Sequence, residues 1–270
     1  MSATRAVVAS PELAGYRDLW SVVPGDLAQR HGIAHLDLAG GVCMACASQS
    51  GKPYAAMLNH AIGLGTDGPV TEDELDALEG FYSRLGADYA VAVETADPEL
   101  GARLADRGFR EGRPWMTFRR AAGAAPAPRT RLRVVEAGRA NASAFGGIVA
   151  AGFMMPPEFS AWMAALVGLP GWACFLALRG DVPVGAAALR VEGDSAWVTL
   201  GATLPEHRGI GAQGALFAAR ARRAAELGAR RLVTETGAPA PGEVPGPSYR
   251  NMLRAGFEEA GLRPNFDSPG

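Results

Sequence analysis

The stretch Ala196–Arg220, AWVTLGATLPEHRGIGAQGALFAAR, decides how the rest of the chain is organised. Its first part, residues 196–202, is apolar and contains threonine, which predicts a buried strand that Pro205 ends. Glycines at 209, 211 and 214 then allow a tight turn, and an alanine- and leucine-rich helix follows at once. A helix N-terminus offers unpaired N–H groups and a partial positive charge, and Arg208 adds a full charge beside it. This arrangement predicts a binding site for a diphosphate group.

One class of diphosphate compound that fits this turn is a dinucleotide. The spacing Gly209-x-Gly211-x-x-Gly214 formally matches the dinucleotide fingerprint, and Glu235 lies where an acid would meet a ribose. In a dinucleotide-binding unit, however, the first glycine follows the strand directly, whereas residues 203–208 intervene in this chain. The 35 residues after Glu235 are also too few for the rest of a doubly wound sheet. A nicotinamide-dependent oxidoreductase is therefore the less favoured alternative.

The second interpretation is a family resemblance. The segment 205–217, PEHRGIGAQGALF, resembles the acyl-CoA-binding motif of the GNAT N-acetyltransferases, Q/R-x-x-G-x-G/A. The three marked positions of that motif hold Arg208, Gly211 and Gln213, and Gln213 departs from the usual glycine or alanine. Farther on, LRAGF at 253–257 is similar to the closing helix-to-strand signature of the family, L-Y-x-x-x-G-F. The two motifs stand in the family's order.

The resemblance implies a reaction and a donor substrate. It implies that acetyl-CoA donates an acetyl group directly to an amine of a small-molecule acceptor. It places the pantetheine arm of the cofactor along the central strand, where backbone groups of Ala202 and Thr203 would pair with it. The residues that it places around the diphosphate are Arg208, Gly209, Gly211, Ala212, Gln213 and Gly214.

The catalytic residues are predicted with alternatives left open. Glu235 ends the strand beside the cofactor strand and is the predicted general base, acting through water, although such a glutamate also commonly accepts a backbone N–H. The resemblance implies a tyrosine as general acid, but that position holds Met252. Tyr249, one helical turn earlier, is the predicted substitute, with simple packing of its ring or protonation by water as the alternatives. Asn251, next to the expected position, is the other candidate substitute and is also assigned to the cofactor-binding residues.

Composition narrows the classes of function. The formal net charge is −2 and charged residues make up 20% of the chain, which gives no basic surface for nucleic acid. No apolar run reaches the roughly 18 residues of a membrane span, and the N-terminus lacks the pattern of a signal peptide. We therefore expect a cytoplasmic protein with no nucleic acid or membrane as partner. The resemblance implies a small-molecule acceptor, and either a monomer or a homodimer is expected.

The cysteines and histidines give no metal or redox site. Cys43 and Cys46 form a C-x-x-C pattern, but they lie in the apolar run 42–47, which predicts a strand. Side chains at i and i+3 of a strand point to opposite faces, so these thiols are expected to be core residues. The four histidines form no helical i, i+4 pair and have no cysteine partner, so no metal is expected.

The order of expected elements repeats along the chain. Residues 33–119 predict the order β-β-β-α-β-α-β, with the third strand over 54–64, and the part after a proline-rich linker at 121–130 repeats this order. The predicted fold class is α/β (α+β), with two tandem GNAT-like lobes, 1–120 and 131–270. Each lobe is expected to be a mixed, mostly antiparallel sheet flanked by helices.

The first lobe is predicted to be degenerate. Glu94 and Glu235 occupy corresponding places, each before a Gly-Phe pair at a helix-to-strand corner. In place of Arg-Gly-Ile-Gly, however, the first lobe has Thr71-Glu-Asp-Glu74, a capping box that starts an amphipathic helix. Carboxylates at that helix start complement its dipole and repel a diphosphate. We expect this lobe to be structural or to help wall the acceptor site.

One further segment is assigned through the resemblance, and another through its composition and through comparison of the two lobes. FMMPP at 153–157 and Trp162 are expected to line the acceptor pocket, with ordinary core as the alternative for Trp162. The proline- and glycine-rich segment 237–247 is expected to act as a lid. Because Met252 replaces the usual tyrosine, a non-catalytic acyl-CoA-binding or sensing protein stands as the main alternative to an enzyme.

Overall fold

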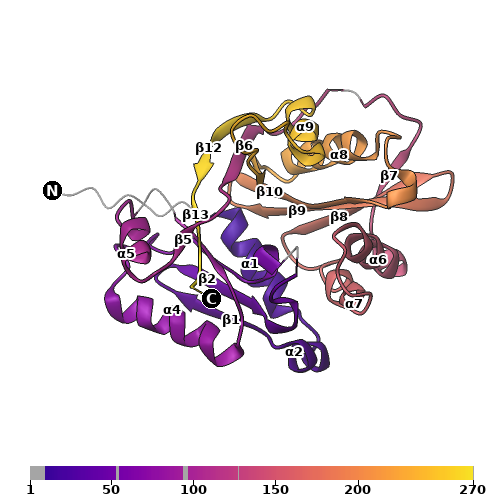
Figure 1. The fold of residues 1–270 in the computed structure, drawn as a ribbon. Coiled ribbons are helices and arrows are strands. Elements are labelled where there is room, and N and C mark those ends of the chain that lie inside the picture. The colour runs from indigo at the N-terminus through magenta and orange to yellow at the C-terminus, as the bar shows by residue number, and fades with distance from the viewer. Residues whose placement is uncertain (1–9, 53–54, 94–96, 127, 270) are drawn as a thin grey trace. The chain divides into compact units, whose positions relative to one another are not determined.

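A computed structural model describes residues 10–52, 55–93, 97–126 and 128–269. The chain forms two compact units (Figure 1). The first comprises residues 1–20, 28–114 and 263–270, and the second comprises residues 21–27 and 115–262. The prediction for Glu94 falls outside the described residues.

The first unit contains a sheet with the strand order β1-β2-β3-β4-β13-β5. Its strands are β1 (Ile33–Leu38), β2 (Gly41–Cys46), β3 (His60–Ile62), β4 (Ala90–Ala92), β5 (Arg110–Glu111) and β13 (Asn265–Asp267). Its helices are α1 (Pro11–Ser21), α3 (Ala55–Leu58), α4 (Glu72–Leu85) and α5 (Leu100–Asp106), with α2 (Gly25–His31) between α1 and β1. β3 and β4 are parallel, whereas β1–β2, β2–β3 and β13 with both its neighbours are antiparallel.

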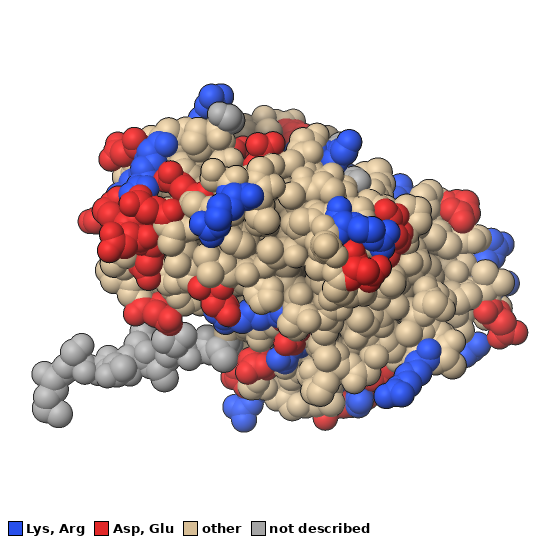
Figure 2. Space-filling model, turned by 90° about the horizontal axis from the view of Figure 1, so that it is seen from below, with Lys and Arg blue, Asp and Glu red and all other residues tan. Residues whose placement is uncertain are grey.

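Helix α4 begins where the capping box predicts. The Thr71 side chain accepts a hydrogen bond from the Glu74 N–H, and the Glu74 carboxylate accepts one from the Thr71 N–H, which confirms the box. Leu75 and Leu78 on its apolar stripe are fully buried in the first core. On its outer side, Arg107 forms ion pairs with three acids of this helix, and Figure 2 shows the acidic side chains gathered over α4.

The single strand predicted over 54–64 is wrong. The described part of this run contains the short helix α3 and then the short strand β3. Short apolar runs fit a helix and a strand equally well, and a contact distant in sequence decides between them. The Asn59 side chain accepts a hydrogen bond of 2.6 Å from the Cys46 N–H, which fixes the bend between α3 and β3.

The cysteines of the first unit lie in its core, as predicted. Every residue of β2 is buried, including Cys43 and Cys46, and both thiols are free. Burial raises the pKa of Cys43 to about 12 and that of Cys46 to about 11. Cys174 of the second unit is free and buried as well.

The second unit contains a sheet with the strand order β12-β6-β11-β10-β9-β8-β7. Its strands are β6 (Trp115–Ala121), β7 (Arg133–Glu136), β8 (Trp172–Arg179), β9 (Val182–Glu192), β10 (Ser195–Thr203), β11 (Arg231–Gly237) and β12 (Glu258–Arg263). Its helices are α6 (Ala142–Gly152), α7 (Phe159–Ala164), α8 (Ala212–Glu226) and α9 (Pro247–Arg254). β10 and β11 are parallel, and the pairs β7–β8, β8–β9, β9–β10 and β11–β6 are antiparallel.

Helices cover both faces of the second sheet. Figure 1 shows α8 and α9 over one face and α6 and α7 over the other. The core under α8 and α9 includes Leu216 and Phe217 of α8, Tyr249 and Met252 of α9, and Phe118 of β6. Two sheets of mixed direction, each flanked by helices, confirm the predicted fold class.

One strand of each sheet comes from a distant part of the sequence. The sequence places Trp115–Ala121 with the first lobe, but β6 pairs with β11 of the second sheet, from Ala121–Arg231 to Trp115–Gly237. Conversely, β13 near the C-terminus lies between β4 and β5 of the first sheet.

Candidate functional site

The central strand of the second sheet loses one of its neighbours before it ends. β10 pairs with β11 only from Ser195–Arg231 to Trp197–Val233. β10 continues to Thr203 beside β9, while β11 continues to Gly237 beside β6. The two parallel strands therefore diverge, and the β11-facing edge of residues 198–203 is left without that partner. Such an edge offers backbone N–H and C=O groups to an extended ligand.

A bulge shapes this open part of β10. The pairing with β9 shifts between Thr199 and Ala202, and Leu200 within the bulge has a φ of +51°. A bulge redirects the backbone and increases the local twist, and bulges are common beside active sites. Ala202 and Thr203, the predicted pantetheine contacts, resume pairing with β9 directly after it. The end of α6 packs here, since a Cβ on Gly152 would lie 2.6 Å from the Ala202 Cβ.

A buried arginine holds the bulge, and no sequence motif pointed to this residue. Arg220 of α8 is 1% exposed. Its Nη1 donates to the carbonyl oxygens of Thr199 (3.0 Å) and Ala188 (3.4 Å), which are opposite each other in the β9–β10 ladder. Its Nε donates to the Leu216 carbonyl, and its buried Nη2 has no partner among the described residues. Burial lowers the pKa of Arg220 to about 9.

The glycine-rich turn leads from β10 into α8 as predicted. Gly209 and Gly211 have φ values of +81° and +87°, a conformation that favours glycine, and Gly211 is the N-cap of α8. No side chain caps the first turn of α8, so no side-chain cap occupies the N–H groups of that turn. Arg208 is exposed beside this turn. The turn therefore combines the main-chain donors and the cation that an anion site requires.

Gln213 points toward β10 and away from the turn. Its Nε2 donates to the Thr203 Oγ1 at 3.0 Å, and its Oε1 lies beside Gly201, where an added Cβ would be 2.8 Å away. The departure from glycine or alanine at this position thus places an amide side chain against the bulge. Ala212 is buried and Gly214 is exposed in the first turn of α8.

The predicted general base has an indole neighbour that no sequence motif indicates. The Trp197 indole Nε1 donates to both carboxylate oxygens of Glu235, at 3.2 and 3.0 Å. Trp197 is 1% exposed, and its ring packs edge-on against Trp172 at 6.3 Å. The parallel register that pairs Trp197 with Val233 places Glu235 on the same face, two residues on. The indole fixes the carboxylate at the point where β10 and β11 diverge.

Tyr249 lies on the other face of the sheet. Its ring packs edge-on against Phe118 at 4.9 Å, whereas Glu235 is paired with Thr117, the adjacent residue of β6. The Tyr249 hydroxyl donates to a Glu259 oxygen at 2.5 Å, and desolvation together with this bond raises its pKa to about 12. The structure therefore does not bring Glu235 and Tyr249 together.

Asn251 and Met252 complete the α9 candidates. The Asn251 Oδ1 accepts a hydrogen bond from the Arg254 Nη2 at 2.6 Å. Met252 is buried in the core under α8 and α9, so the position where the family resemblance implies a tyrosine carries a packing residue.

The predicted acceptor segment is divided between surface and core. Met154 is 68% exposed with a φ of +56°, which is unusual for a residue other than glycine. Trp162 is fully buried and packs edge-on against Phe159, so its side chain is core. The segment between β11 and α9, predicted as a lid, has no regular secondary structure before Pro247.

The corresponding helix start in the first unit is occupied by side chains. Besides the capping box at Thr71, the Asp97 carboxylate accepts from the Val70 N–H at 3.0 Å and pairs with Arg103 at 2.7 Å. Acids therefore satisfy this helix start from within the chain, as the degenerate character of the first lobe predicts.

Metal-binding groups and membrane-spanning helices are both absent from the described parts of the chain. Over residues 10–52, 55–93, 97–126 and 128–269, no group of His, Cys, Asp and Glu side chains has the arrangement of a metal site. None of the helices in these ranges combines the length and the apolar character that crossing a membrane requires.

Solved structures match the fold, although no protein-family model and no curated protein matches the sequence. A GCN5-related N-acetyltransferase from Kribbella flavida is 17% identical, with a TM-score of 0.58 and 97% of each chain covered. A tandem GNAT protein from the clavulanic acid biosynthesis pathway is 14% identical, with a TM-score of 0.56 and 97% of each chain covered. A GNAT-family acetyltransferase from Colwellia psychrerythraea is 13% identical, with a TM-score of 0.51, covering 96% of this chain and 97% of that one. These likenesses show that the chain has a tandem GNAT fold.

Proposed function

We propose that the second unit binds acetyl-CoA and transfers its acetyl group to an amine of a small molecule. One observation carries the proposal. β10 and β11 diverge beyond Trp197–Val233, and helix α8, whose first turn no side chain caps, begins shortly after the open part of β10 ends. In this arrangement the diphosphate binds at 208–214 and the pantetheine arm pairs with the open edge of β10 at Ala202 and Thr203. The similar tandem GNAT protein of the clavulanic acid pathway, whose structure is one without acetyl-CoA, points to the same donor for this chain.

Glu235 is the proposed base in this reaction. The attacking nitrogen loses a proton, directly or through a water, to the Glu235 carboxylate as the C–N bond forms and the C–S bond breaks. The leaving thiolate of coenzyme A then takes up a proton. Trp197 orients the Glu235 carboxylate through its indole N–H. Water is the proposed acid, because the Tyr249 hydroxyl already donates to Glu259.

A thermal-shift experiment tests which cofactor binds. Ligand binding stabilises the folded state by about 2.7 kcal/mol at a hundredfold excess over Kd, so acetyl-CoA and CoA should raise the melting temperature whereas NAD should not. Arg208→Glu reverses the charge beside the diphosphate and should abolish that rise. Arg110→Glu, at an exposed arginine of β5 in the first unit, is the matched control. If acetyl-CoA raised the melting temperature of Arg208→Glu as much as that of the wild-type protein, the diphosphate would not bind at this turn.

A second candidate function is binding or sensing of acyl-CoA without turnover. Two observations favour it: the Tyr249 hydroxyl is engaged by Glu259, and Met252 fills the core. Incubation with acetyl-CoA, a panel of amines and a thiol reagent separates the two candidates. Thiol release that depends on the amine supports the enzyme, and tight binding without release supports the sensor.

A further inference from the structure

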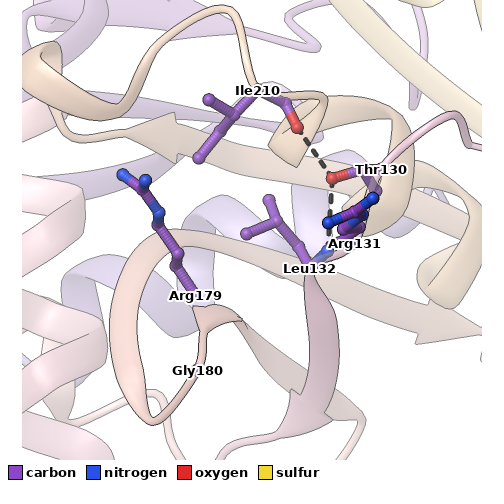
Figure 3. Close-up of a pocket in the computed structure, with 6 residues that line it drawn as sticks. All are labelled: Thr130, Arg131, Leu132, Arg179, Gly180 and Ile210. Atoms are coloured by element: carbon purple, nitrogen blue, oxygen red, sulfur yellow. Dashed lines mark hydrogen bonds between the residues drawn. The ribbon is translucent and has the colours of Figure 1, made fainter.

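A cavity of about 380 Å³ opens beside the glycine-rich turn of the second unit. Its walls come from the residues before β7, from the β8–β9 turn and from the glycine-rich turn itself (Figure 3). The lining residues are Thr130, Arg131, Leu132, Arg179, Gly180 and Ile210. Its volume lies within the range of small-molecule sites, roughly 300–1,000 Å³.

Two cations dominate the chemistry of this cavity. In Figure 3 the guanidinium groups of Arg131 and Arg179 lie on either side of Leu132. Among the described residues, neither guanidinium has a hydrogen-bond or ion-pair partner, and no acid belongs to the lining. Asp181, the second residue of the β8–β9 turn, pairs instead with Arg133 at 3.2 Å. The cavity therefore favours an anion with an apolar part.

A hydrogen-bonded threonine joins the cavity to the glycine-rich turn. The Thr130 Oγ1 donates to the Ile210 carbonyl at 2.7 Å and accepts from the Leu132 N–H at 3.2 Å. This segment also packs on the turn, because a Cβ on Gly211 would lie 2.9 Å from the Thr130 Cβ and 3.2 Å from the Arg129 carbonyl oxygen. Since Ile210 belongs to both the turn and the cavity wall, the cavity adjoins the turn.

We propose that this cavity receives the adenosine end of a coenzyme A thioester and that Arg131 and Arg179 hold its 3′-phosphate. The inference rests on the proposed function, since it takes the diphosphate to lie at 208–214. A phosphate monoester carries a charge of about −1.5 to −2 at neutral pH, and guanidinium groups bind its oxygens in pairs. Leu132 and Ile210 supply apolar contact for the nucleoside.

The consequence is a choice of acyl donor. An acyl group on the 4′-phosphopantetheine of a carrier protein has the same thioester and arm, but it has no nucleotide to place in the cavity. Arg131 and Arg179 therefore act as specificity residues: they favour acyl-CoA over carrier-bound donors and over CoA analogues that lack the 3′-phosphate.

Calorimetry on the full chain with CoA and 3′-dephospho-CoA tests the proposal at low ionic strength. The wild-type protein should bind CoA about 10- to 100-fold more tightly than 3′-dephospho-CoA. The double variant Arg131→Gln/Arg179→Gln should bind the two within about twofold of each other, with its affinity for 3′-dephospho-CoA unchanged. Arg133→Gln, at the neighbouring arginine that pairs with Asp181, is the control and should keep the wild-type preference.

The outcomes separate this proposal from the one on which it rests. Equal affinity of the wild-type protein for both ligands would overturn the role of the cavity and leave the proposed function in place. So would an equal loss of affinity for both ligands in the double variant. Failure of the wild-type protein to bind CoA would overturn the proposed function, and the donor choice with it.

Discussion

Replacing Arg220 by methionine tests how the bulge of β10 is held. Desolvation lowers the pKa of Arg220 from 12.5 to about 9. At 1.36 kcal/mol per pKa unit, this corresponds to roughly 5 kcal/mol of unfavourable free energy for burying the charge. Three hydrogen bonds to backbone carbonyls offset that cost, at roughly 1.5–3 kcal/mol each for a charged donor. The two contributions are of similar size, so the arginine has little net effect on global stability.

We therefore expect Arg220→Met to change the free energy of unfolding by less than about 2 kcal/mol, because methionine keeps apolar contact with Phe217 and removes the buried charge. Arg220→Ala leaves a cavity as well and should cost about 2–5 kcal/mol more than the methionine variant. Urea denaturation measures both. Arg222→Met is the matched control at an exposed position of the same helix, with an expected change below about 0.5 kcal/mol.

The sharper measurement is local. In Arg220→Met the carbonyls of Thr199 and Ala188 lose their donor, so the β9–β10 ladder should open more often at the bulge. Hydrogen exchange in peptides covering 184–203 should speed up by about tenfold, while peptides from β8 stay unchanged. A loss of more than about 4 kcal/mol in global stability, or unchanged exchange at the bulge, would refute this account of Arg220.

Three further predictions concern titration and turnover. Burial lowers the pKa of His60 from 6.5 to about 4, so the unfolded chain binds a proton that the folded chain does not, and stability falls as the pH drops from about 6.5 to 4. His60→Gln should flatten that part of the pH dependence, and an unchanged slope would contradict this. The thiols, whose pKa burial raises, should react with an aromatic disulfide at pH 8 only after denaturation; rapid reaction of the native protein would contradict their burial. These thiols are Cys43, Cys46 and Cys174. Glu235→Gln should lower kcat about 10²- to 10⁴-fold with KM for acetyl-CoA nearly unchanged, and an unchanged kcat would exclude Glu235 as the base.

Local signals predicted the part of the fold that carries the site. The strand, the turn and the helix from Ala196 to Arg220 follow from the apolar run, from Pro205 and from the glycines, whose positive φ values the structure shows at Gly209 and Gly211. Each of these signals acts over a few residues. The capping box at Thr71 is of the same kind, and it set the start of α4 correctly.

The position of Arg220 in α8 indicates that its side chain is buried, although the composition of the helix does not. Several arginines lie in α8, and composition alone makes all of them look exposed. Arg220, however, follows Leu216 by four residues and Phe217 by three, so it lies on the apolar stripe of the helix, whereas Arg222 does not. The phase of the helix therefore marks the one arginine that helical geometry directs to the sheet. That it meets the bulge depends on the register of β9 and β10, which no local pattern specifies.

Strand partners were the part that the sequence could not supply. Nothing within residues 115–121 specifies β11 as their neighbour. The same holds for β13, which lies far from β4 and β5 in sequence. The pairing of strands that are distant in sequence depends on the whole sheet. A prediction that follows sequence order therefore groups such a strand with the elements that precede it.

The exchanged strands predict where the chain can be cut. β6 pairs with β11 along the full length of both strands, and Phe118 of β6 is buried in the second core. A fragment of residues 131–263, cut after the proline-rich linker, lacks β6; it would expose one edge of β11 and leave a cavity at Phe118. A fragment of residues 115–263 keeps every strand of the second sheet.

We expect residues 115–263 to unfold cooperatively in urea with dispersed amide resonances, and residues 131–263 to aggregate or to remain unfolded. The two fragments differ only in residues 115–130, so the comparison isolates β6 and the linker. Because the loss of Phe118 alone costs about 3–5 kcal/mol, Phe118→Ala in the longer fragment should lower the urea midpoint without abolishing the transition. A cooperative transition for residues 131–263 would show that the second sheet folds without β6. The second domain would then begin after the proline-rich linker.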